Sequence, residues 1–204
     1  MTAQPPSKPT SSSGNLLPRD GLAYYYGPIF DAAQSRAAFE ALNDEIAWAH
    51  DETMMFGKRI ITARKVAWYG DQPYLYRYSG NSKTALPWTA ALKAIKGEVE
   101  AVSGSTYNSC LLNLYADGGQ GMGWHSDDEK MLQPDGAIAS VSFGAARHFD
   151  FRHKQDRTKC RVVLEDGSLL LMTGKTQRYW QHAMPKTKKV TEPRINLTFR
   201  TIVD

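Results

Sequence analysis

Residues 121–130 read GMGWHSDDEK and place a histidine two positions before an aspartate, directly after a glycine-rich run. Imidazole and carboxylate groups are both good ligands for divalent metal ions, so His125 and Asp127 are candidate ligands. Glycine, serine and aspartate also favour turns, and the same composition is typical of an ordinary polar surface loop. The stretch by itself does not decide between a metal site and a loop.

A third candidate ligand, His182, lies in the later stretch YWQHAMP. Two imidazoles and one carboxylate on one face of an octahedral metal leave positions open, as non-heme Fe(II) oxygen chemistry requires. Zinc hydrolases also use three protein ligands, but the sequence lacks their separate general-base motif. A His-x-Asp pair followed by a distant histidine therefore favours iron.

Two predicted strands near these histidines carry polar residues on one face and apolar residues on the other. An antiparallel strand with its polar face in water has the same pattern. A polar face inside a barrel would instead make a pocket for a small dicarboxylate, because arginine offers a planar fork that matches carboxylate oxygens. The inward residues would be Leu111, Asn113 and Tyr115 in CLLNLY, and Arg194, Asn196, Thr198 and Arg200 in RINLTFRTI.

The elements that must position these residues change from helices to strands along the chain. Apolar spacing predicts a helix from Asp31, its N-cap, to about His50. Its buried face would carry Ala38, Leu42, Ile46 and Ala49. A second helix is predicted after Leu86, with Pro87 near its start and its end near Gly104.

After Tyr107 the pattern alternates with period two in short segments separated by turns. Helices first and strands afterwards favour an α+β fold in which helices brace one side of a sandwich or barrel. The predicted organisation is a disordered tail over 1–14, N-terminal helices over 15–106 and an all-β core over 107–204.

The composition suits one intracellular domain: 204 residues, 42% of them hydrophobic. No apolar run approaches the roughly 20 residues of a membrane span, and no secretory signal is evident. Cys110 and Cys160 lie far apart in apolar segments, which suits buried thiols. We expect a monomer without membrane contact, cytoplasmic in a bacterium or nuclear in a eukaryote.

The formal net charge is only +4, but the basic residues cluster. Any one cluster is typical of a solvated surface, whereas three raise the expectation of a polyanionic partner. The clusters are Lys58, Arg59, Arg64 and Lys65; Arg152, Lys154, Arg157, Lys159 and Arg161; and Lys186, Lys188 and Lys189.

Several stretches together carry a family resemblance, among them ARKVAWYGD (63–71), LNLYADGGQGMGWHSDDE (112–129), IASVSFGAARHFDFRHK (138–154) and PRINLTFR (193–200). In them the chain resembles the AlkB-type Fe(II)/2-oxoglutarate dioxygenases, and more closely the animal-type branch that repairs alkylated duplex DNA. The resemblance covers nearly all of the chain from residue 54. It implies a double-stranded β-helix, a jelly-roll relative, over 107–204, with a nucleotide-recognition lid within 15–106.

The resemblance also implies roles for particular residues. Fe(II) would be held by His125, Asp127 and His182. Arg194 would form a salt bridge with 2-oxoglutarate, and Arg200 would be shared between this cosubstrate and the acidic side of the base pocket. The residues assigned to 2-oxoglutarate are Asn113, Tyr115, Arg194, Asn196 and Arg200. Those assigned to the substrate are Phe56, Lys58, Arg64, Tyr76, Tyr78, Ser79, Asp128 and Glu129.

The implied reaction is the oxidative demethylation of N-alkylated bases such as N1-methyladenine and N3-methylcytosine, with release of formaldehyde, succinate and carbon dioxide. These methylated rings are cationic, so aromatic side chains beside carboxylates would favour them over normal bases. Reaching them in a duplex requires base flipping. Phe56, beside Met55, resembles an apolar wedge that fills the gap, while Lys58 and Arg59 would hold phosphates. A buried Met/Phe pair in a hairpin has the same composition.

Two rival functions stay open: the same chemistry on RNA or on a protein side chain, and a nucleic-acid-binding module without activity. The intact ligand residues speak against the second.

The other histidines are not interpreted as metal ligands: His50 is expected at a helix end, and His148 and His153 on the surface or toward phosphates. Tyr179 and Trp180 are expected to pack beside His182 and orient it. The run from Gly118 to Gly123 lacks the Lys-Ser/Thr ending of a phosphate loop.

Overall fold

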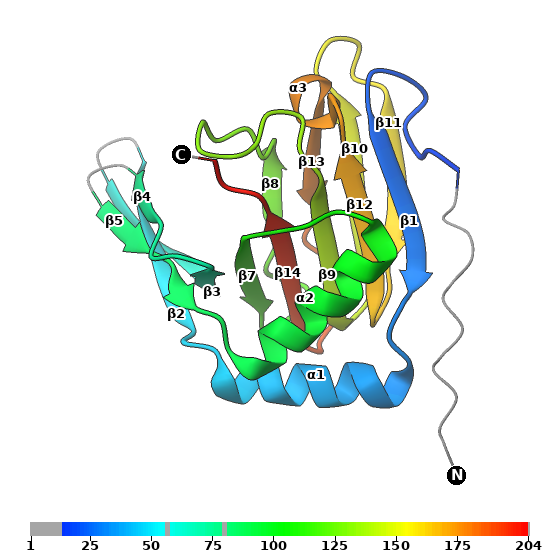
Figure 1. Cartoon of the computed structure of the whole chain (residues 1–204). Helices are drawn as coiled ribbons and strands as arrows, with labels where there is room; N and C mark the ends of the chain where they lie inside the picture. The colour runs from blue at the N-terminus through cyan, green and yellow to red at the C-terminus, as the bar shows by residue number, and fades with distance from the viewer. Residues whose placement is uncertain (1–13, 56–57, 79–80, 204) are drawn as a thin grey trace.

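Two facing β-sheets, a separate hairpin and two long helices make up the chain as the computed structural model describes it (Figure 1). The described residues are 14–55, 58–78 and 81–203, with the backbone alone described at 53–55, 58–60, 76–78 and 81–82. The predicted tail therefore falls almost entirely outside the described residues.

The larger sheet has eight strands, seven of which follow one another across it in antiparallel pairs. In spatial order these are β1 (Leu22–Pro28), β12 (Ser168–Thr173), β9 (Ile138–Gly144), β14 (Arg194–Arg200), β7 (Ser109–Tyr115), β3 (Lys58–Gly70) and β2 (Ala49–Met55). The eighth, β6 (Leu86–Pro87), pairs with β3 in parallel.

The smaller sheet has the order β11 (Lys159–Leu164), β10 (Arg147–His153), β13 (Trp180–Met184) and β8 (Met122–His125). From β7 onward the chain passes between the sheets: β7, β9, β12 and β14 lie in the larger sheet, and β8, β10, β11 and β13 in the smaller one. This alternation is the double-stranded β-helix that the sequence predicts. The hairpin of β4 (Leu75–Tyr78) and β5 (Asn81–Thr84) stands apart from both sheets, beside β2 and β3 (Figure 1).

Helix α1 (Ala32–Glu45) begins as expected, but it ends earlier than the sequence predicts. Asp31 and Gln34 form a capping box, in which each side chain accepts a hydrogen bond from the other residue's backbone N–H. Ile46 is already extended, and His50 belongs to β2, where its ring Nδ1 donates to the Thr62 carbonyl at 2.8 Å. Pairing with β3 therefore overrides the helical spacing, and Ala49 is an exposed strand residue.

Helix α2 (Ala90–Ser103) follows Thr89, whose side chain accepts from the Leu92 N–H at 3.2 Å. It ends at Gly104 as predicted, in the left-handed conformation with φ 68° that glycine adopts without strain. Pro87 lies in β6 and not in the helix.

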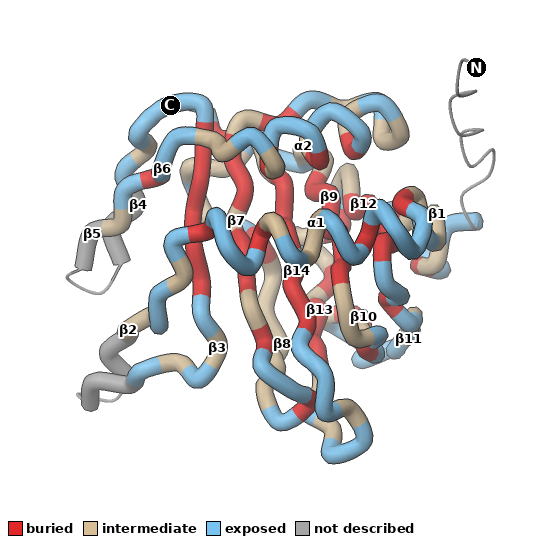
Figure 2. The backbone as a smooth tube through the Cα atoms, turned by 90° about the horizontal axis from the view of Figure 1, so that it is seen from below, coloured by how far each residue is buried: buried red, intermediate tan, exposed pale blue. Residues whose placement is uncertain are grey.

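Strand parity divides the interior into two apolar layers and one polar face. Ile195, Leu197 and Phe199 of β14 turn toward α1 and α2 and are fully buried there. A second apolar cluster fills the space between the sheets near β1, β10 and β13, around Phe151 and Trp180. Figure 2 shows that the buried residues run along the central strands. The alternate residues of β14, which include Arg194, therefore turn toward the smaller sheet, as the sequence predicts.

The N-terminal half contributes strands as well as helices, because β1, β2 and β3 join the larger sheet. The larger sheet therefore contains strands from both sides of the predicted boundary at residue 106. None of the described helices is long and apolar enough to span a membrane.

Candidate metal centre

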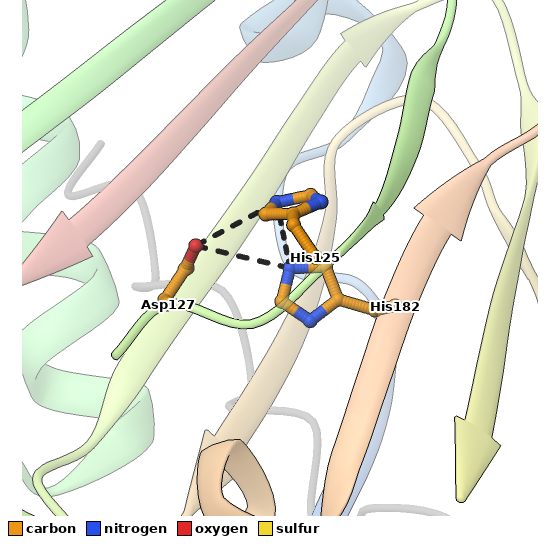
Figure 3. A group of neighbouring side chains, drawn as sticks. All are labelled: His125, Asp127 and His182. Carbon is orange, nitrogen blue, oxygen red and sulfur yellow. Dashed lines mark hydrogen bonds and ion pairs between the residues drawn. The ribbon is translucent and has the colours of Figure 1, made fainter. Parts of the chain in front are cut away.

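Strand pairing brings the two candidate histidines together. His125, at the end of β8, is the register partner of His182 on β13. Their Nε2 atoms are 3.1 Å apart. The side chains converge from neighbouring strands, as Figure 3 shows. Residues far apart in the sequence therefore meet as a cross-strand pair.

Asp127 completes the group from the chain just beyond β8. Its Oδ1 lies 3.6 Å from His125 Nε2 and 3.9 Å from His182 Nε2. One ligand atom from each residue lies within 4.8 Å of the others, and in the part of the chain that is described no further group of this kind is found. The arrangement matches the triad expected from the sequence.

Hydrogen bonds outside the triad fix its orientation. His125 Nδ1 is 2.8 Å from the Gly123 carbonyl, to which it donates, so the Nε2 lone pair faces the centre. The Asp127 N–H donates to Gln177 Oε1 at 2.9 Å. The ring of His182 stacks on Phe149 with centroids 5.3 Å apart. Neighbouring groups thus hold each of the three residues.

The protonation states also suit a cation. Burial lowers the pKa of His182 to about 3. Asp127 raises this pKa, whereas His125 and Arg200 lower it further. His182 is therefore neutral at pH 7, the form that binds metals. Burial alone would raise the pKa of Asp127, but Arg200 and the two histidines bring it below its ordinary value. An ionised carboxylate beside a neutral imidazole is a donor set that fits Fe(II).

Arg200 reaches the triad through its ion pairs. One of its terminal nitrogens lies 2.9 Å from Asp127 Oδ2, and the other lies 3.5 Å from Glu129 Oε1. Asp127 thus turns one oxygen to Arg200 and the other to the histidines. Of the two roles expected for Arg200, its contact with the acidic residues is therefore present. Its contact with 2-oxoglutarate stays a prediction.

Arg194 is buried without an anionic partner among the described residues. Only 2% of the residue is exposed, one terminal nitrogen donates to Ser142 Oγ at 2.7 Å, and the Nε has no hydrogen-bond partner. Burial lowers its pKa to about 10, still well above neutral pH. A buried cation lacking a counter-charge is costly, so this position fits the carboxylate of a ligand.

The other residues assigned to the cosubstrate line the same polar face. Tyr115 is the register partner of Arg194, and Asn113 that of Asn196. Burial raises the pKa of the Tyr115 phenol, although the nearby arginines oppose that effect. The amide nitrogen of Asn196 is occupied by Ser140 Oγ and the Val141 carbonyl, at 2.8 and 3.0 Å. The structure therefore brings these residues together on β7 and β14.

Arg64, expected to bind substrate, contacts a residue of the same polar face. Its Nε donates to Asn113 Oδ1 at 2.8 Å, so it links strand β3 to a residue assigned to the cosubstrate. A role in substrate binding stays a prediction for Arg64.

The remaining substrate residues are only partly described. Asp128 is exposed, with Lys154 Nζ 3.8 Å from its carboxylate. It lines, with Asp127, Glu129 and Arg200, a cavity of about 200 Å³ beside the triad. Phe56 and Ser79 lie outside the described residues, as do the side chains of Lys58, Tyr76 and Tyr78.

His153 corrects one interpretation of the sequence. It was expected on the surface or toward phosphates, yet it is 1% exposed and stacks on Tyr179. Its Nδ1 lies 3.0 Å from Asp156 Oδ1, and its Nε2 lies 3.4 Å from Asp20 Oδ2. The inward parity of β10 explains the burial, since residues 147, 149, 151 and 153 share one face. Trp180 is buried against His153, with ring centroids 5.0 Å apart, and its carbonyl accepts from Ser126 Oγ at 2.9 Å. The phenyl rings of Phe149 and Phe151 lie against His182, and the orienting role expected for Tyr179 and Trp180 stays a prediction.

The sequence matches the 2OG-Fe(II) oxygenase superfamily over residues 21–200. It is 41% identical over 195 residues to DNA oxidative demethylase ALKBH2 of Homo sapiens, covering 90% of this chain and 75% of the relative. The Mus musculus protein of the same name is 39% identical over 216 residues, covering 97% and 90%. Alpha-ketoglutarate-dependent dioxygenase alkB homolog 3 of Homo sapiens is 37% identical over 187 residues, covering 87% and 65%.

One solved structure, "The structure of OsALKBH1", aligns with a TM-score of 0.63 at 16% identity, covering 91% of this chain and 98% of that one. At this identity the likeness concerns the fold alone.

The triad predicts that divalent ions stabilise the protein. With Mn(II) at about 100 times its Kd, linkage adds about 2.7 kcal/mol. For a domain of this size the thermal midpoint should then rise by roughly 5 to 10 °C. His182→Ala should remove the rise, because the ion loses one of its ligands. His148→Ala, an exposed position on β10, is the matched control and should keep it. An equal rise in both variants would place the ion elsewhere.

Proposed function

This chain belongs to the 2OG-Fe(II) oxygenase superfamily, and from that membership we propose that it repairs alkylated DNA by oxidative demethylation. It is an AlkB-type dioxygenase close to the ALKBH2 branch, whose curated members are named DNA oxidative demethylases. The observation that carries the proposal is the His125, Asp127 and His182 triad together with Arg194, a buried arginine on β14 that has no anionic partner among the described residues. A binding module without activity would not need to keep both.

Bound Fe(II), together with 2-oxoglutarate and oxygen, supplies the oxidation that removes an N-methyl group as formaldehyde. The triad residues would hold the iron. Arg194 would bind a carboxylate of 2-oxoglutarate with the help of its Nε, which has no partner in the protein, and Tyr115 is its register partner on β7. Arg200 keeps Asp127 ionised and turned toward the histidines.

The substrate side of the proposal rests on charge. N1-methyladenine and N3-methylcytosine carry a positive charge that normal bases lack, and Asp128 and Glu129 lie next to the metal ligand Asp127. Aromatic rings at Tyr76 and Tyr78 would stack on the base. Basic residues are also exposed elsewhere on the protein: Lys159 and Arg161 on β11, and Lys186, Lys188 and Lys189 after β13. Exposed positive charges of this kind suit contacts with a nucleic-acid backbone.

Duplex DNA is the favoured partner in this proposal, with the enzyme acting as a monomer. Phe56 carries the duplex preference, as the wedge that would replace a flipped base. That role rests on the sequence, since Phe56 lies outside the described residues.

The direct test is formaldehyde release from oligonucleotides that contain N1-methyladenine or N3-methylcytosine. We expect release that requires both iron and 2-oxoglutarate and produces succinate in step. Asp127→Ala should abolish it, because the carboxylate ligand is lost. Equal turnover of an unmethylated oligonucleotide, or release only from methylated RNA or a methylated peptide, would contradict the proposed substrate.

Arg194→Met should raise the 2-oxoglutarate concentration needed for half-saturation by about 30-fold or more. The change removes a charge-assisted contact whose loss costs about 2 kcal/mol or more when the partner stays buried. A cosubstrate titration at fixed oligonucleotide measures it, with Arg36→Met on the exposed side of α1 as control. An unchanged half-saturation point would move the carboxylate anchor to another residue.

Phe56→Ala should separate duplex from single-stranded substrates. Stacking of a base on an aromatic ring is worth about 1 to 3 kcal/mol, so we expect activity on a methylated duplex to fall by roughly 5-fold or more. The same methylated strand alone has no gap to fill and should be nearly unaffected. Lys58→Ala is the comparison: a phosphate contact should weaken both substrates and reduce the salt dependence of binding. Equal losses in Phe56→Ala would remove the case for a wedge.

A further inference from the structure

Arg147 is a buried cation that the proposed chemistry does not use. It is the first residue of β10, it is 2% exposed, and no carboxylate pairs with it among the described residues. Its terminal nitrogens donate instead to four backbone carbonyls. These belong to Asp117, Gly118, Gln120 and Pro185, at 3.2, 3.3, 2.9 and 2.9 Å. All four hydrogen bonds of the guanidinium therefore go to backbone carbonyls, while its Nε has no partner.

The four carbonyls come from two loops that lead to metal ligands. Residues 117–120 form the turn that enters β8, which ends at His125. Pro185 directly follows β13, which carries His182. One side chain therefore ties the chain that approaches the first histidine to the chain that leaves the second.

Strand β8 needs such a tie because of its place in the sheet. It is short and lies at the edge of the smaller sheet, where β13 is its one neighbour. Even that pairing is irregular, since the register shifts between His182 and Met184. An edge strand held along one side moves more easily than a central one. Arg147 adds a connection from β10, on the far side of β13.

The glycine run makes the close approach of the two loops possible. The Gly118 N–H donates to the Val190 carbonyl, and the Thr187 N–H donates to the Gly118 carbonyl, both at 2.8 Å. A Cβ on Gly118 would lie 2.8 Å from Val190 O and closer still to Thr187 O. A Cβ on Gly121 would lie 2.5 Å from Met184 O. Both are contacts that a side chain could not make without moving backbone.

We propose that Arg147 is a positioning residue for the metal centre, which sets the place of His125 relative to His182 by clamping these two glycine-fitted loops together. Without the guanidinium, the Gln120 and Pro185 carbonyls lose the nitrogen that donates to both, the Asp117 and Gly118 carbonyls lose one of two donors each, and the loops should separate to reach water. The distance between the histidines would then no longer be fixed at the value that an ion needs. The inference rests on the metal centre of the proposed function and not on its DNA substrate.

The test is the affinity of the metal-free protein for Mn(II), measured by titration calorimetry beside the thermal midpoint of the same samples. Loss of a group that orients metal ligands typically costs 10- to 100-fold in affinity, and we expect a loss in this range for Arg147→Met. Arg147→Lys should recover part of it, because an ammonium group donates up to three hydrogen bonds. Gly121→Ala should also weaken Mn(II) binding, because the added Cβ would push the two loops apart while Arg147 stays in place.

Arg161→Met is the matched control, because Arg161 on β11 is exposed and pairs with Asp150. It should bind Mn(II) as the unmodified protein does. A lower thermal midpoint in Arg147→Met with unchanged affinity would overturn the inference, since Arg147 would then only stabilise the fold. If that variant does not fold, Arg147→Lys and Gly121→Ala decide by the same measure. Absence of Mn(II) binding in the unmodified protein would instead refute the metal centre itself.

Discussion

The pairing of β8 with β13 is the constraint on which the site depends. It sets His125 opposite His182 with their Nε2 atoms 3.1 Å apart, and it leads the chain directly to Asp127. The neutral imidazole of His182 and the ionised carboxylate of Asp127 meet the ring of His125 at this separation, which suits a cation between the three groups. Much of the surrounding structure restrains these three groups: Gln177 holds the Asp127 backbone, Phe149 supports the His182 ring, and the loops on either side are tied together.

Three buried arginines show how partners decide the work of one residue type. The Nε of each arginine lacks a hydrogen-bond partner, but the terminal nitrogens differ. Those of Arg147 donate to carbonyl oxygens, one of Arg194 donates to a hydroxyl, and those of Arg200 pair with two carboxylates. Their effects on pKa differ accordingly: burial lowers the pKa of Arg194 to about 10, whereas the carboxylates bring that of Arg200 above its ordinary value despite burial. Arg147 thus binds backbone carbonyls, and Arg194 has no anionic partner among the described residues. Arg200 lowers the pKa of the candidate metal ligand Asp127 and so keeps it ionised.

The sequence predicted the features that strand parity and residue chemistry control. The polar face of β14 and its apolar opposite follow from a period of two, and the His-x-Asp pair with a later histidine needs only ligand chemistry. Strands β8 and β13 were not predicted: β8 is short and glycine-bearing, and β13 follows directly on the four-residue helix α3 (Thr176–Tyr179). The end of α1 was also missed, since pairing with β3 outweighs the helical spacing near His50. The partners of Arg147, Arg200 and His153 depend on tertiary contacts, which local patterns do not contain.

The order in which the strands pair has a consequence for how the molecule is made. Strand β1 pairs with β12, and the Trp180 indole donates to the Arg19 carbonyl at 3.0 Å. These N-terminal contacts can therefore form only after residues near the other end of the chain are available. Contacts of such high sequence separation slow folding, since the chain loses loop entropy before they form. During synthesis His125 and Asp127 emerge long before His182, Arg194 and Arg200. A nascent chain thus carries an incomplete metal site, and iron is best held only after the last strand has closed the larger sheet.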